Sequence, residues 1–204
     1  MQSGSDHPPG ARSVGLVHLA LTWPRERRRG IAAKRIELRR HTDNDGDVLT
    51  EDGARAALEI GSRLRGGYAL LVSTGAQRAT QTLACFACAL RDPIPGGAVV
   101  ESGLRSERED RWREAYRKAG SGRLEDLRSA DSELVESDSR ALGEALGRVL
   151  ERLDDGETAL VVGHSPTNEA AVLGLTGEIV DPISKGSGVQ VSADADGFRV
   201  ERLD

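Results

Sequence analysis

Short apolar runs alternate with stretches of helical periodicity from residue 35 to the end of the chain. The expected strands are residues 35–40, 68–73, 98–101 and 158–163. Continuous apolar runs such as TALVVG at 158–163 are typical of strands that are buried on both faces of a parallel sheet. Near the C-terminus, residues 188–192 and 198–203 flank an Asp-Ala-Asp-Gly turn, which predicts a β-hairpin.

Between these runs, apolar residues recur every three or four positions, which predicts amphipathic helices. Thr50 is placed to cap the first helix, and the Gly66-Gly67 pair is placed to end it. The expected inward faces of three helices are Ala54, Ala57, Leu58, Gly61 and Leu64; Ala79, Leu83, Phe86, Ala87 and Leu90; and Leu142, Ala145, Leu146, Val149 and Leu153. A further helix is expected after residue 163, with Ser165 as its cap and Pro166 at its first position, where a missing N–H costs nothing.

This alternation predicts an α/β fold, a three-layer αβα sandwich with a mostly parallel central sheet. A long charged region, residues 102–137, interrupts the alternation and is expected to be a helical insert. In open parallel sheets, ligands bind outside the carboxyl ends of the strands. The residues that directly follow each strand are therefore the first candidates for function.

The chain has 204 residues, which favours one domain with an extension over two full domains. Residues 1–35 contain seven basic and two acidic residues, so they differ in charge from the rest of the chain. We expect a basic, flexible N-terminal extension at 1–35 and a single domain at 36–204.

Charge and composition exclude several classes of protein. A formal net charge of −5 and an aromatic content of 3% argue against a general nucleic-acid binder, because such proteins need basic grooves and stacking surfaces. The apolar run 14–23 is too short for a membrane span, and its basic cluster follows it, the reverse of a signal peptide. Cys85 and Cys88 cannot form a disulfide framework. We expect a cytoplasmic protein with no membrane or nucleic-acid partner.

Basic side chains of two kinds follow three of the predicted strands. The first strand runs into Arg40 and His41, a short loop leads from the second to Arg78, and 158–163 is followed by His164. Parallel strands would bring these four residues to one edge of the sheet. Guanidinium groups match the oxygens of a phosphate dianion, and a neutral imidazole can attack phosphorus and carry the phosphoryl group.

These residues lie in stretches that resemble the histidine phosphatase superfamily, which includes the phosphoglycerate mutases. The similar stretches are LRRHT at 38–42, LTEDG at 49–53, STGAQRATQT at 73–82 and VVGHSP at 161–166, in family order. Thr42 stands where the family has Gly. The resemblance covers roughly residues 35–191 and implies a phosphoglycerate mutase-like fold, because several motifs in order are far more specific than one.

The resemblance implies a phosphomonoester phosphatase that needs no metal or other cofactor. His41 would attack phosphorus, while Arg40, Arg78 and His164 would hold the phosphate oxygens. Glu107 is the candidate general acid, as the first acidic residue after Leu104, and Glu109 and Asp110 stay open for that role.

The acidic loop after His41 could line the entrance of the site, with Asn44 reaching a phosphate oxygen. Residues 41–52 also partly mimic a calcium loop, but a predicted strand precedes them where a helix is required. Cys85 and Cys88 form a C-x-x-C on a helix, for which buried or half-buried thiols are expected rather than zinc or redox chemistry.

Other functions within the family remain open. They are a phosphoglycerate mutase-type phosphoryl transferase, a protein phosphohistidine phosphatase, and a relative that binds a phosphorylated ligand without turnover. The basic residues of the charged region are interleaved with acids and are expected to form an ion-paired helix surface, which favours a phosphatase over a mutase. A small phosphorylated substrate is expected, while its identity and the oligomeric state stay open.

Overall fold

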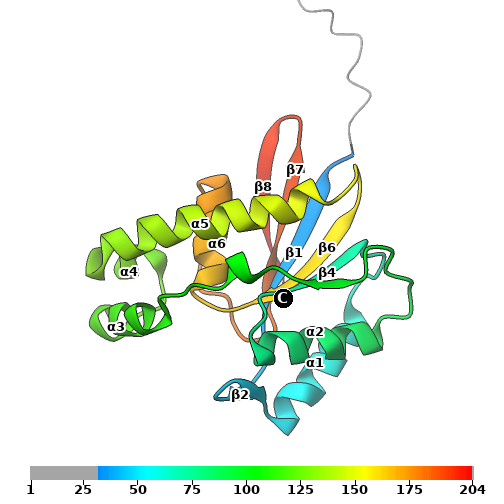
Figure 1. The fold of residues 1–204 in the computed structure, drawn as a ribbon, viewed down its shortest axis with the longest axis horizontal. Coiled ribbons are helices and arrows are strands. Elements are labelled where there is room, and N and C mark those ends of the chain that lie inside the picture. Colours follow the sequence, from blue (N-terminus) through cyan, green and yellow to red (C-terminus); the bar gives the residue numbers. More distant parts are fainter. Residues whose placement is uncertain (1–31, 204) are drawn as a thin grey trace, which may run out of the picture. The chain divides into compact units, whose positions relative to one another are not determined.

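The computed structural model describes residues 32–203. Its six-stranded sheet has the order β5-β4-β6-β1-β7-β8 (Figure 1). The strands are β1 (Lys34–Arg40), β4 (Leu70–Ser73), β5 (Ala98–Val100), β6 (Thr158–Gly163), β7 (Gly188–Asp194) and β8 (Gly197–Leu203). The first four in sheet order pair in parallel, whereas β7 and β8 are antiparallel. The expected strands and the C-terminal hairpin are confirmed.

Helices cover both faces of the sheet and complete the predicted three-layer αβα sandwich. One layer is α1 (Glu51–Arg63) and α2 (Gln77–Ala89), and the other contains α5 (Ser132–Glu151) and α6 (Thr167–Thr176) (Figure 1). Strand β6 contributes side chains to the core on each face of the sheet, because successive side chains of a strand point to opposite faces. Leu160 and Val162 pack in the core beneath α1 and α2, and Val161 packs in the core beneath α5 and α6.

The region expected as a helical insert contains a short 3-10 turn η2 (Ser102–Leu104), α3 (Glu109–Ala119) and α4 (Leu124–Ala130). Helix α5 begins at Ser132, within this region. Trp112, Leu124 and Leu127 are buried in the same core as α5, so the charged region packs onto the domain through a few apolar residues.

Three local expectations from the sequence are wrong. Leu58 is 46% exposed, because α1 buries the single row that contains Ala57 and Leu58 is turned about 100° away from it. Helix α6 begins at Thr167, with Pro166 rather than Ser165 at the cap position, because the Ser165 hydroxyl donates to the Glu169 carboxylate. Cys88 is exposed, and Cys85 is half-buried.

Two further expectations concern location and domain organisation. The basic extension at 1–35 lies, apart from residues 32–35, outside the described residues, and Lys34 and Arg35 already belong to β1. Of the helices within residues 32–203, none has both the length and the apolar character that a membrane span requires. The cytoplasmic location stays a prediction.

Candidate active site

The carboxyl ends of β1 and β6 place His41 and His164 side by side. The two strands pair in parallel with Arg40 opposite Gly163, so each histidine is the next residue along its strand. Their ring centroids are 5.3 Å apart, with the ring planes tilted by 59°. Both side chains are nearly buried, with 5% of His41 and 7% of His164 exposed.

The hydrogen bond of His41 determines which ring nitrogen is free to react. Its Nδ1 lies 2.7 Å from the carbonyl oxygen of Thr42, which can only accept a hydrogen bond. In the neutral ring Nδ1 must therefore carry the proton, and Nε2 keeps its lone pair. Burial lowers the pKa of His41 to about 4, and the charges of Arg78 and Arg40 act in the same direction. His41 is thus neutral at pH 7 before an anion binds.

His164 is held in the same neutral state. Its Nε2 is 2.9 Å from the hydroxyl oxygen of Thr74, at the end of β4. Burial lowers the pKa of His164 to about 3, with Arg78 contributing to the decrease. Two neutral imidazoles and two guanidiniums give the site a positive charge, which the Asp47 carboxylate beside Arg78 partly offsets.

Arg40 and His164 each have a buried nitrogen with its hydrogen-bonding capacity unused within residues 32–203. Arg40 donates from one terminal nitrogen to the carbonyl of Ile183 at 3.0 Å, but its Nε has no partner there, and neither has Nδ1 of His164. Unsatisfied buried polar atoms are uncommon in folded proteins, and they cluster where a ligand binds. Phosphate oxygens would satisfy the Arg40 donor.

Arg78 lies in the first turn of α2 and is paired with Asp47. The Asp47 carboxylate accepts from the Arg78 guanidinium at 2.7 Å and from the backbone N–H of Gln77 at 3.2 Å. Asp47 belongs to the tight hairpin formed by β2 (Asn44–Asp45) and β3 (Val48–Leu49), whose Gly46 adopts a positive φ of 57°. The carboxylate therefore caps α2, whose own N-cap residue offers no side-chain hydrogen bond, and shares Arg78 with any bound anion.

Two residues in α6 support the site and were not expected from the sequence. The Asn168 side chain accepts from the backbone N–H of His164 and donates to the carbonyl of Arg39, so it joins the ends of β6 and β1. Glu169 is fully buried and accepts from Ser165 and from the backbone N–H of Ile183, whose carbonyl receives Arg40. Burial raises the pKa of Glu169. Their position one helical turn after His164 is the only signal in the sequence.

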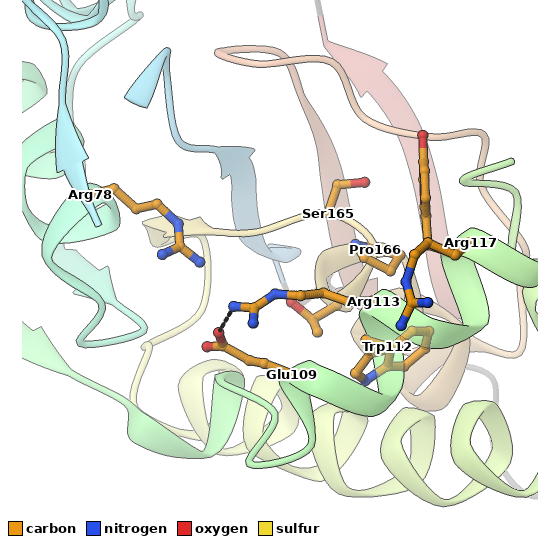
Figure 2. A pocket seen from close by; sticks show the side chains of 9 residues that line it. Arg78, Glu109, Trp112, Arg113, Arg117, Ser165 and Pro166 are labelled. Atoms are coloured by element: carbon orange, nitrogen blue, oxygen red, sulfur yellow. Dashed lines mark hydrogen bonds and ion pairs between the residues drawn. The ribbon is translucent and has the colours of Figure 1, made fainter. Parts of the chain in front are cut away.

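A cavity of about 450 Å³ opens beside the arginines (Figure 2). One side is formed by Arg78 and the segment that follows His164, and the other by a single face of α3. The lining residues are Arg78, Glu109, Trp112, Arg113, Tyr116, Arg117, Ser165, Pro166 and Thr167.

The three acid candidates differ in their relation to this cavity. Glu109 lines it and accepts from Arg105 at 2.7 Å and from Arg113 at 3.4 Å. Glu107 and Asp110 are exposed and do not line it. Of the three candidates, Glu109 is therefore the one that lines the cavity, and its oxygens already accept from two guanidiniums.

The loop after His41 is a hairpin rather than a metal loop. Asn44 donates to the carbonyl of Gly46 within the turn, so its amide is used locally instead of facing a phosphate. Asp43 pairs with Lys185 at 2.5 Å, and Asp47 turns to Arg78. The part of the chain that the structure describes contains no group of three or more His, Cys, Asp or Glu side chains that could hold a metal ion.

Solved structures of known proteins share the fold of the described residues. The phosphoglycerate mutase-like architecture expected from the motifs is thereby confirmed. No protein-family model and no curated protein sequence matches the chain, so the likeness is one of structure.

Individual solved structures agree over most of the domain at low sequence identity. A phosphoglycerate mutase from Bacillus anthracis superposes with a TM-score of 0.61 at 16% identity, covering 84% of this chain and 93% of that one. A phosphoserine phosphatase from Entamoeba histolytica, in complex with 3-phosphoglyceric acid, gives a TM-score of 0.62 at 17% identity, covering 84% and 97%. The protein histidine phosphatase SixA, complexed with tungstate, gives a TM-score of 0.52 at 18% identity, covering 83% of this chain and 96% of that one.

Proposed function

We propose that this protein is a metal-independent phosphatase of phosphate monoesters that works through a phosphohistidine on His41. The observation that carries the proposal is the state of His41. It is a nearly buried, neutral imidazole whose Nδ1 is committed to the Thr42 carbonyl, with two arginines and a second histidine around it. A small phosphorylated substrate is the expected partner, and no cofactor is required.

The proposed reaction has two steps. In the first, Nε2 of His41 attacks phosphorus in line, an N–P bond forms, and the bond from phosphorus to the leaving oxygen breaks with its electron pair on that oxygen. Arg40, Arg78 and His164 hold the equatorial oxygens and stabilise their charge in the transition state. In the second step water attacks the phosphohistidine, releasing inorganic phosphate and returning His41 to its starting state.

Protonation of the leaving group limits the range of substrates. Both oxygens of Glu109 accept hydrogen bonds from guanidiniums, which can only donate, so neither oxygen is turned to a leaving group as a proton donor. Glu107, expected as the acid from the sequence, lies outside the cavity. We therefore propose that the preferred leaving groups depart without much protonation, as phenolates do, and that Glu109 acts as a base toward water in the second step.

A second candidate function is the hydrolysis of phosphohistidine in proteins. The same observation favours it, because imidazole is a leaving group that needs no strong acid, and SixA shares the fold. The cavity framed by α3 favours a small substrate instead. A mutase fits less well, because most basic residues of α3 are ion-paired with acidic residues of this protein. A comparison of p-nitrophenyl phosphate with a phosphohistidine-containing peptide separates the first two candidates.

The test is phosphate release from p-nitrophenyl phosphate by the wild type and His41→Ala, each with and without EDTA. The proposal predicts activity that survives EDTA and falls by at least about a thousandfold in the variant. Thermal unfolding of both proteins controls for loss of the fold. Activity that EDTA abolishes, or that His41→Ala retains, contradicts the proposal.

A further inference from the structure

Most basic residues of the charged region are paired with acids, but Arg117 and Arg128 have no acidic partner within residues 32–203. The pairs are Arg108 with Asp138, Arg111 with Asp131 and Glu133, Arg113 with Glu109 and Asp110, and Lys118 with Glu114. The ion-paired surface expected from the sequence is thus confirmed for these residues. Arg117 makes no hydrogen bond or ion pair with any residue between 32 and 203. Glu114 lies one turn away, and the charge of Arg117 only adds to the lowering of the Glu114 pKa that Lys118 causes.

Arg117 differs from an ordinary surface arginine because it lines the same cavity as Arg78 and as Ser165, the residue after His164. Figure 2 shows it on the side of the cavity away from Arg78, while Arg113 extends from α3 toward Arg78. The guanidinium of Arg113 is already bonded to Glu109 and Asp110. Arg117 is therefore the cavity-lining cation whose donors are still available within the described part of the chain.

The walls between Arg78 and Arg117 are flat and largely apolar. Trp112 is 4% exposed and is fixed by its indole N–H, which donates to Asp138 at 2.6 Å. Tyr116 leaves 52% of its surface exposed, and Pro166 lies on the opposite side of the cavity. Aromatic and proline surfaces of this kind favour a planar ring.

We propose that the cavity binds a leaving group made of an aromatic ring and one carboxylate, with the ring against Trp112 and Tyr116 and the carboxylate on Arg117. This inference rests on the proposed phosphatase activity and specifies its substrate class. A phenolic ring also meets the requirement for a leaving group that departs without an acid. One unpaired guanidinium matches one negative charge, and the ionised Asp47 beside Arg78 disfavours a leaving group that carries further phosphates.

The test compares two probes that differ in one charge. The probes are 3-(4-phosphonooxyphenyl)propanoate and 4-propylphenyl phosphate, in which two methylenes insulate the phenol, so both leaving groups have similar acidity. The wild type should prefer the carboxylate probe by about five- to tenfold in kcat/KM, mainly through KM, because Arg117 is remote from the reacting phosphorus. Arg117→Gln should reduce this preference below about twofold.

Lys118→Gln is the matched control, because it removes the same charge from the neighbouring position, which does not line the cavity. It should keep the preference of the wild type. Equal kcat/KM for the two probes with the wild type, or equal loss of preference in both variants, overturns the inference. Calorimetric binding of both probes is measured in parallel. If neither probe is hydrolysed, the proposed function fails. In that case, a binding preference for the carboxylate probe that depends on Arg117 still supports the carboxylate site. Equal binding of the two probes overturns that site.

Discussion

The two neutral histidines predict a specific loss of stability on mild acidification. In the unfolded chain a histidine has a pKa of about 6.5, whereas burial lowers the pKa of His41 to about 4. Between these values the unfolded chain binds a proton that the folded chain does not, so stability must fall as the pH falls. From pH 7 to pH 5, this difference amounts to at most about 2 kcal/mol for His41. His164 contributes in the same direction, because its pKa is lowered to about 3.

The assay is urea unfolding of the wild type and His41→Asn at pH 7 and pH 5, in buffers without phosphate, since a bound anion would raise the histidine pKa. The asparagine amide can still donate to the Thr42 carbonyl but does not titrate. The wild type should lose up to about 2 kcal/mol more than the variant between the two pH values. Carboxylates titrate equally in both proteins and cancel. If both proteins lose the same stability, His41 is not held neutral, and the argument for its nucleophilic state fails.

Three further changes have defined outcomes. Glu109→Gln should reduce steady-state turnover of p-nitrophenyl phosphate about tenfold to a hundredfold while the initial burst of nitrophenolate remains, because loss of the base slows only the second step. Asp47→Asn should lower the inhibition constant of inorganic phosphate about fivefold, because Arg78 loses its competing carboxylate. Gly174→Ala should lower the free energy of unfolding by about 2–3 kcal/mol in urea, because its Cβ would lie 1.7 Å from the Ser139 carbonyl oxygen in the α5–α6 contact.

Matched variants sharpen each of these measurements. Glu107→Gln removes an acid outside the cavity and should change turnover by less than about twofold. A larger loss of turnover than in Glu109→Gln would assign the acid–base role to Glu107 instead. Asp45→Asn removes a charge from the same hairpin and should leave phosphate inhibition unchanged. Gly147→Ala adds a methyl on α5 that meets only Leu175, at 3.7 Å, and should be neutral or stabilising. Equal effects within any pair would contradict the contact that is invoked.

The fold could be predicted from the sequence because its buried strands and helices have different periodicities. TALVVG matches β6 residue for residue, and the inward face of α5 is buried as its spacing indicates. Errors arose where tertiary contacts override local preference. Leu58 is apolar but lies off the buried row of α1, and Ser165 bonds to Glu169 instead of capping α6.

The convergence of the histidines and arginines could also be predicted, because parallel strands end at one edge of the sheet. The residues that tune them could not. Asp47 reaches Arg78 only through the turn of a hairpin that no periodicity indicates, and Thr74 meets His164 from a different strand. The choice between Glu107 and Glu109 depends on where α3 begins. Glu109 is its first residue and lines the cavity, whereas Glu107 precedes the helix and is exposed.

Detection of the covalent intermediate tests the central claim most directly. The protein is mixed with phenyl phosphate labelled with ³²P, quenched in alkali within the first turnover, digested, and the labelled peptide is sequenced. Phosphohistidine survives alkali and is lost in acid, unlike a phosphoserine ester. The account predicts an acid-labile label on His41 that forms and decays at rates consistent with turnover. Turnover without any label on His41, or with the label on another residue, would contradict it.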